Sequence, residues 1–166
     1  MMNTLRQLKN ELREEYETTK RFLKNYPTDK GNYTPHQKSM QLGRLSNHLV
    51  DIFGWPDLML RTRELDVSVP SENKPLETRE ELEKRLDEQY QKSLEALEKA
   101  EEKDLDPKWS LTNRGEKLKT WSKYGSIRHA LNQITHHRAQ IGVYFRLNEI
   151  PVPGSYGPSA DDQFFG

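Results

Sequence analysis

Apolar side chains recur every three or four residues in four stretches of the chain, with charged residues between them. This spacing places the apolar positions on one face of a helix. It predicts four amphipathic helices, at about residues 3–26, 35–63, 78–103 and 121–148. Such helices bury their apolar faces most simply against one another. The pattern therefore predicts an all-α fold, a four-helix bundle, in a single domain over residues 1–166.

Residue types at the helix ends support these boundaries. The Thr-Pro pair at residues 34–35 is typical of a helix start, and Thr78 followed by Glu81 predicts a capping box at the third helix. Gly54 and Pro56 should end or kink the second helix, because proline has no amide hydrogen and clashes with the preceding turn.

The segments between the helices are rich in helix breakers. Residues 64–77 contain two prolines and are predicted to be a linker, and residues 107–120 are expected to be irregular. The Pro/Gly-rich C-terminal tail, residues 149–166, either packs on the end of the bundle or stays loose. Phe164 and Phe165 are the side chains that would dock it.

Composition excludes several kinds of protein. The chain has 26 basic and 26 acidic residues and no cysteine. Zero net charge argues against a nucleic-acid partner, and the lack of cysteine excludes disulfides and Cys-based zinc sites. No stretch has the apolar length of a signal peptide or a membrane span, so we expect a cytoplasmic protein without a membrane partner.

The fourth predicted helix carries three of the five histidines. At about 100° per residue, His137 lies roughly 50° from the centre of the apolar face, whereas His129 and His136 point toward solvent. Gln133 is one helical turn before His137, so a shared ligand would be within reach of both side chains. Arg138 also points inward and needs a buried partner, because an unpaired buried charge is costly.

On the second predicted helix, His48 lies on the flank of the apolar face. Asp51, three residues later, is a candidate fourth ligand, a carboxylate that supports a ligand, an ordinary surface carboxylate, or the partner of Arg138. On the pattern alone, the simpler interpretation of His48 and His137 is a pair of core histidines held by hydrogen bonds.

Two stretches resemble a known family: NQITHHRAQIGVYFRLNEIPVPGSYGPSADD, and the histidine within SMQLGRLSNHLVDIFGW. They are similar to the DinB superfamily, also called damage-inducible or YfiT-like proteins. The resemblance implies a four-helix bundle that binds one divalent ion, often zinc or nickel, through one histidine of the second helix and two of the fourth. Carried over by position, the metal ligands are His48, Gln133 and His137. This chain departs from the usual pattern, since Gln133 replaces a histidine and Ala139 replaces a glycine.

Three protein ligands would leave the ion with open positions, where a bound thiol or water becomes a nucleophile. The resemblance therefore implies an enzyme that adds a low-molecular-weight thiol, or water, to a small-molecule electrophile, and it also implies a homodimer. Two alternatives stay open: a non-catalytic metal-binding stress-response protein, and a metal-free bundle with an interaction role.

Overall fold

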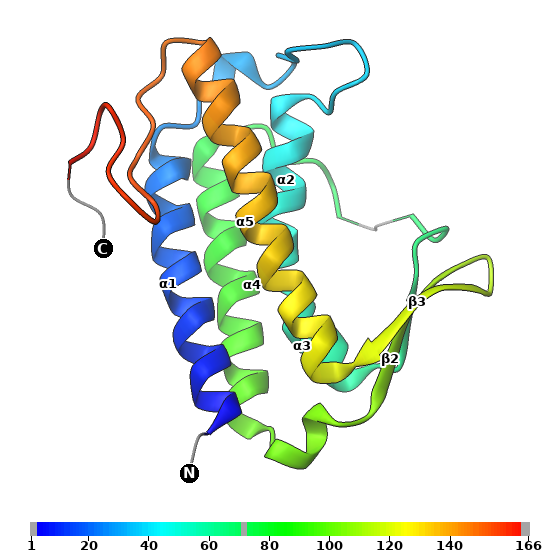
Figure 1. Ribbon diagram of the computed structural model, residues 1–166. Coiled ribbons are helices and arrows are strands. Elements are labelled where there is room, and N and C mark those ends of the chain that lie inside the picture. The colour runs from blue at the N-terminus through cyan, green and yellow to red at the C-terminus, as the bar shows by residue number, and fades with distance from the viewer. Residues whose placement is uncertain (1–2, 71–72, 164–166) are drawn as a thin grey trace.

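Five α-helices form the body of the protein in a computed structural model that describes residues 3–70 and 73–163 (Figure 1). The helices are α1 (Thr4–Lys24), α2 (Leu42–Ile52), α3 (Trp55–Arg61), α4 (Arg79–Lys99) and α5 (Lys123–Leu147). Because α2 and α3 follow one another along one side, the five helices occupy four positions of a bundle. Short 3-10 turns, Thr28–Lys30 and Glu102–Leu105, follow α1 and α4.

The expectation of a purely all-α four-helix bundle is wrong, because the described chain also forms a three-stranded mixed sheet. Strand β1 (Glu64–Asp66) pairs in parallel with β2 (Lys108–Asn113), which pairs antiparallel with β3 (Glu116–Ser122). The sheet extends away from the bundle beside α3 and the start of α5 (Figure 1).

The sheet occupies the segments predicted to be linker and irregular chain. The β2–β3 hairpin turns at Arg114 and Gly115, whose φ angles are +51° and +81°. Positive φ at both central residues gives a turn whose twist matches that of the paired strands. Trp109 of β2 is only 1% exposed, so burial of an aromatic side chain against the bundle helps to hold the hairpin.

The predicted helix over residues 35–63 is wrong in its bounds. Residues 35–41 are not helical, and Thr34 does not cap a helix, since its hydroxyl donates to the carbonyl oxygen of His36 at 2.6 Å. The predicted break at Gly54 and Pro56 is confirmed: α2 ends at Ile52, and α3 begins with Pro56 in its first turn.

The other three predicted helices match α1, α4 and α5 to within a few residues at each end. The capping box is confirmed, because the amide of Glu81 donates to Thr78 Oγ1 and the amide of Thr78 donates to Glu81 Oε2. The expected apolar faces meet in one core, whereas Tyr124, near the start of α5, is 42% exposed. The core includes Leu8, Leu12, Phe22, Leu45, Leu49, Leu82, Leu86, Ile127, Ile134 and Phe145.

The C-terminal tail packs along α1 and α5. Asn25 at the end of α1 donates to the carbonyl oxygen of Pro151 at 2.9 Å, and Arg21 donates to that of Gly154 at 3.2 Å. From α5, Arg146 forms an ion pair with Asp161 at 2.5 Å. Phe164 and Phe165, the expected docking side chains, lie outside the described residues. Among the helices described, none combines the length and the apolar character needed to cross a membrane.

Candidate functional site

Two histidines from distant parts of the chain face each other where α2 packs against α5. The ring centroids of His48 and His137 are 4.8 Å apart, with the rings inclined at 71°. The ring centroid of Trp55, at the start of α3, lies 5.6 Å from that of His48. The helical angles therefore placed both inward histidines correctly.

The other two histidines of α5 differ from each other. His136 is exposed, as expected. His129 is not simply exposed: its ring stacks on Trp121 with centroids 4.9 Å apart, and burial lowers its pKa. The stacking partner comes from β3, a strand that helical periodicity could not reveal.

Their surroundings favour the neutral form of both facing histidines. Burial first, and then the nearby His137 and Arg44, lower the pKa of His48 to about 4. Burial also lowers the pKa of His137. The Nδ1 of His137 lies 2.8 Å from Gln140 Oε1, and because an amide oxygen only accepts, Nδ1 carries the hydrogen. The Nε2 of His137 then keeps a lone pair, which is the form of imidazole that binds a metal ion.

Gln133 lies one turn before His137 on α5 and is partly buried. Its side chain makes no hydrogen bond to another residue in the described ranges, so its amide oxygen is available. Within residues 3–70 and 73–163, no group of three or more His, Cys, Asp or Glu side chains is placed to hold a metal ion. The third ligand that the family resemblance implies is the amide of Gln133, which is neither a histidine nor a carboxylate. Two neutral imidazoles suit ions such as zinc and nickel, whereas an amide oxygen binds these ions more weakly than imidazole does.

Asp51 is turned toward α4. Its Oδ1 accepts from Arg85 Nη1 at 3.2 Å and from Asn73 Nδ2 at 3.3 Å. Burial raises the pKa of this carboxyl, and the Arg85 charge opposes that shift. Asp51 thus joins α2 to α4. It also lines a cleft next to His48.

Arg138 is buried as predicted, but Asp51 as its candidate partner is wrong. Its Nη1 lies 2.6 Å from Glu15 Oε2 on α1 and donates to Thr19 Oγ1 at 3.1 Å. Its Nη2 donates to the hydroxyl of Tyr156 in the tail at 2.9 Å. The sequence contained a signal for Glu15 that was missed: this carboxylate falls on the apolar face of α1, three residues after Leu12.

A cleft of about 700 Å³ adjoins His48. Its sides are α2, the loop over residues 26–32 and the segment over residues 73–77. Small-molecule sites typically have volumes of roughly 300–1,000 Å³, so the cleft is large enough for a substrate. Sequence reasoning missed it, because its three sides are separated along the chain by nine or more residues.

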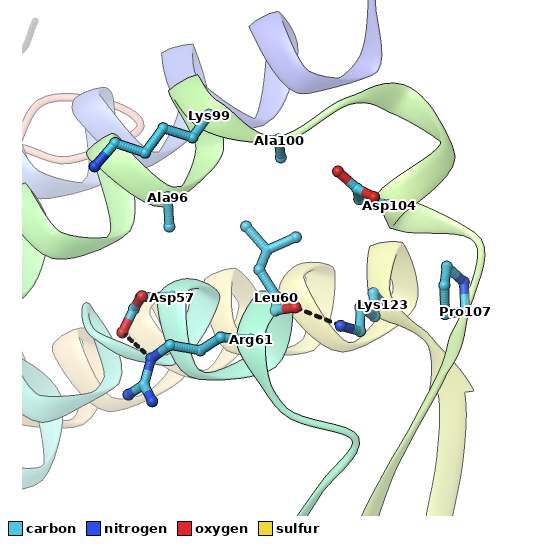
Figure 2. A pocket seen from close by; sticks show the side chains of 9 residues that line it. All are labelled: Asp57, Leu60, Arg61, Ala96, Lys99, Ala100, Asp104, Pro107 and Lys123. Carbon is cyan, nitrogen blue, oxygen red and sulfur yellow. Dashed lines mark hydrogen bonds and ion pairs between the residues drawn. The ribbon is translucent and has the colours of Figure 1, made fainter.

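A second cavity, of about 270 Å³, lies between α3, α4 and the start of α5 (Figure 2). Its charged groups already have partners: the Lys123 amino group donates to the carbonyl oxygen of Leu60, and Arg61 pairs with Asp57 at 2.7 Å. Neither facing histidine lines it, so it is not a candidate for the same site.

The fold and these contacts define a class: helical bundles with two inward histidines on neighbouring helices. A model of the DinB family matches residues 1–163, and the chain belongs to this family. The solved structures that are similar to it include two DinB-like proteins. A DinB-like protein from Bacillus subtilis has 18% sequence identity and a TM-score of 0.65, over 87% of this chain and 95% of that one. A DinB-like protein from Bacillus cereus ATCC 10987 also has 18% identity and a TM-score of 0.65, over 84% of this chain and 89% of that one. No curated protein matches the sequence.

Proposed function

We propose that this protein is a divalent-metal-dependent enzyme in which His48, Gln133 and His137 hold one zinc or nickel ion. The observation that carries the proposal is the pair of facing imidazoles, 4.8 Å apart and contributed by two different helices. Both rings are partly buried, and His48 lines an open cleft, as is typical of a site that must be both shielded and reachable.

The residues around the pair have distinct tasks. Gln140 holds the Nδ1 hydrogen of His137 and so leaves the Nε2 lone pair free for a ligand. Trp55 packs against the edge of His48 and limits the motion of that ring. The cleft gives a small molecule access to His48. When bound, the ion would supply an activated thiol or water for attack on an electrophile.

Metal content provides the first test. Purified protein is loaded with zinc or nickel, dialysed, and analysed by inductively coupled plasma mass spectrometry. We expect near-stoichiometric metal in the wild type and its loss in His48→Ala and His137→Ala. His36→Ala is the matched control, because His36 is exposed on the loop before α2. Titration of the wild type with nickel should also quench the fluorescence of Trp55, which a Trp55→Phe variant identifies.

Activity provides the second test. Metal-loaded protein is incubated with a panel of electrophiles and several low-molecular-weight thiols, and conjugates are detected by mass spectrometry. Conjugation that requires both histidines would support the enzyme. Bound metal without conjugation or hydrolysis would favour a non-catalytic metal-binding protein, and a wild type that takes up no metal would refute the site.

A further inference from the structure

The cleft beside His48 carries charges of both signs that do not neutralise one another by direct contact. Arg44 and Lys74 supply the cations, and Asp29 and Glu77 supply the carboxylates. None of these four side chains forms an ion pair within the described residues. The third carboxylate of the cleft, Asp51, is already compensated by Arg85. The unpaired lining is therefore balanced, with two positive and two negative groups.

The walls of the cleft are held by hydrogen bonds. The amide of Gly43, in the first turn of α2, donates to the carbonyl oxygen of Gly31 at 2.8 Å. Asn47 holds the opposite wall, since its Nδ2 donates to the carbonyl oxygen of Leu76 and its Oδ1 accepts from the amide of Leu76, both at 2.8 Å. A preformed site loses less entropy when it binds a ligand.

Two walls of the cleft lie so close together at Gly31 and Gly43 that a side chain at position 43 would be crowded. A Cβ atom at Gly43 would lie 3.1 Å from the Gly31 carbonyl oxygen and 3.3 Å from the Tyr26 hydroxyl oxygen. Tyr26 is 4% exposed, and its hydroxyl has no hydrogen-bond partner among the described residues. A polar ligand group at this end of the cleft would satisfy a donor that is otherwise unpaired.

Helix α2 adds a preference for where the ligand's negative charge would lie. Of the first amides of α2, those of Leu42 and Gly43 donate to loop carbonyl oxygens. No carbonyl oxygen of the described chain accepts from the amide of Arg44. A helix N-terminus favours a negative group, and Arg44, which lines the cleft, adds a positive charge in the first turn of α2.

We propose that this cleft binds a small zwitterionic molecule, one carrying a carboxylate and an ammonium group, with the carboxylate at the Arg44 end. Balanced charges disfavour a polyanion such as a nucleotide, because Asp29 and Glu77 would repel it. From Arg44 to His48 is four residues along α2, about 6 Å, so the rest of such a molecule would reach the facing histidines. That last step rests on the proposed metal site, whereas zwitterion binding does not.

The dipeptide alanyl-alanine is a suitable probe, because it has both charges and no ionisable side chain. Its N-acetylated form lacks the ammonium, and its C-terminal amide lacks the carboxylate. Each is titrated into 15N-labelled full-length protein, and the amide signals of Gly31 and Gly43 are followed by NMR. We expect saturable shifts with the dipeptide and at least about fivefold weaker binding of each blocked form, as for a loss of roughly 1 kcal/mol.

Variants identify the groups responsible. Arg44→Gln and Glu77→Gln should each weaken dipeptide binding by about fivefold or more, whereas Arg13→Gln, an exposed position on α1, should not change it. Absence of saturable shifts, or equal binding of the blocked forms, would overturn the proposal. His137→Ala separates the two proposals, because His137 is a proposed metal ligand that does not line the cleft. It should remove the metal and leave the dipeptide-induced shifts of Gly31 and Gly43 intact.

Discussion

The guanidinium of Arg138 on α5 lies 2.6 Å from the carboxylate of Glu15 on α1, and the two side chains are only 2% and 8% exposed. This buried pair joins the helix that carries His137 to the first helix of the bundle. Removing one partner leaves an unpaired buried charge, which typically costs about 3–5 kcal/mol.

Glu15→Ala should therefore lower the free energy of unfolding by about 3–5 kcal/mol, measured by urea denaturation. Glu14→Ala, one residue earlier and exposed, is the control and should change it by less than about 0.5 kcal/mol. The double variant Glu15→Leu/Arg138→Met should recover most of the loss, because neither charge then remains buried. Equal stability of Glu15→Ala and wild type would contradict this account.

The tail is attached to the same pair through one hydroxyl. Tyr156 donates to Glu15 Oε1 at 2.5 Å and accepts from Arg138, although 65% of the residue's surface is exposed. Tyr156→Phe should destabilise the protein by about 1–2 kcal/mol and make the tail more sensitive to limited proteolysis, because charge-assisted hydrogen bonds are lost. Tyr124→Phe, at an exposed position on α5, should leave both measurements unchanged.

In the proposed metal site, Gln133 would be the ligand that limits the affinity for the ion. Gln133→His should raise zinc or nickel affinity by roughly tenfold or more, because imidazole binds these ions better than an amide oxygen. Gln133→Ala should lower it. Both affinities are measured by competition with a chromophoric chelator, with His36→Ala as the control. If Gln133→His binds no more tightly than the wild type, residue 133 does not reach the ion.

Asp66 should give the hairpin a distinct acid sensitivity. Hydrogen bonds from Ser68, and then from the amides of Arg114 and Gly115, lower the pKa of Asp66 from 3.8 to about 2. Since the folded-state pKa is the lower one, the stabilisation is complete above about pH 4 and is lost as the pH falls through about 2. The carboxyl carbon shift of Asp66, followed by NMR between pH 1 and 5, should report this low value.

Stability measurements give an independent check on Asp66. Asp66→Asn should show a smaller decrease in urea-induced unfolding free energy between about pH 4 and pH 2 than the wild type, because the titrating carboxyl is gone. Asp106→Asn, an exposed aspartate before β2, should retain the wild-type pH dependence. A wild-type midpoint near 3.8 for Asp66 would show that these hydrogen bonds do not form in solution.

Helical periodicity was sufficient to identify the long helices. The apolar positions of α1, α4 and α5 recur over 21 to 25 residues, so a few residues that depart from the pattern do not hide the helical period. Periodicity also placed His48 and His137 on inward faces, because the direction of a side chain on a regular helix follows from its position alone. Periodicity failed over residues 35–41. The Thr34-Pro35 pair resembles a helix start, but the Thr34 hydroxyl donates to the carbonyl oxygen of His36 within a turn.

Strand pairing could not be inferred in the same way. β1 and β2 are more than 40 residues apart, and β1 is only three residues long, so no local pattern of useful length exists. Trp109 and Leu111 alternate with polar residues, but the Arg-Gly turn lacks the Asn-Gly or Asp-Gly signature of a two-residue hairpin. The sheet depends on contacts that form only when the bundle brings these segments together.

The sequence by itself determined the long helices, their inward faces and the two histidines on those faces, because these properties depend on neighbours three and four residues away. Only the tertiary structure decided that His48 meets His137, that Arg138 pairs with Glu15, and that three distant segments enclose a cleft. Those relationships depend on how helices pack and which loops approach one another. Packing is a property of the whole chain, so a one-dimensional pattern cannot contain it.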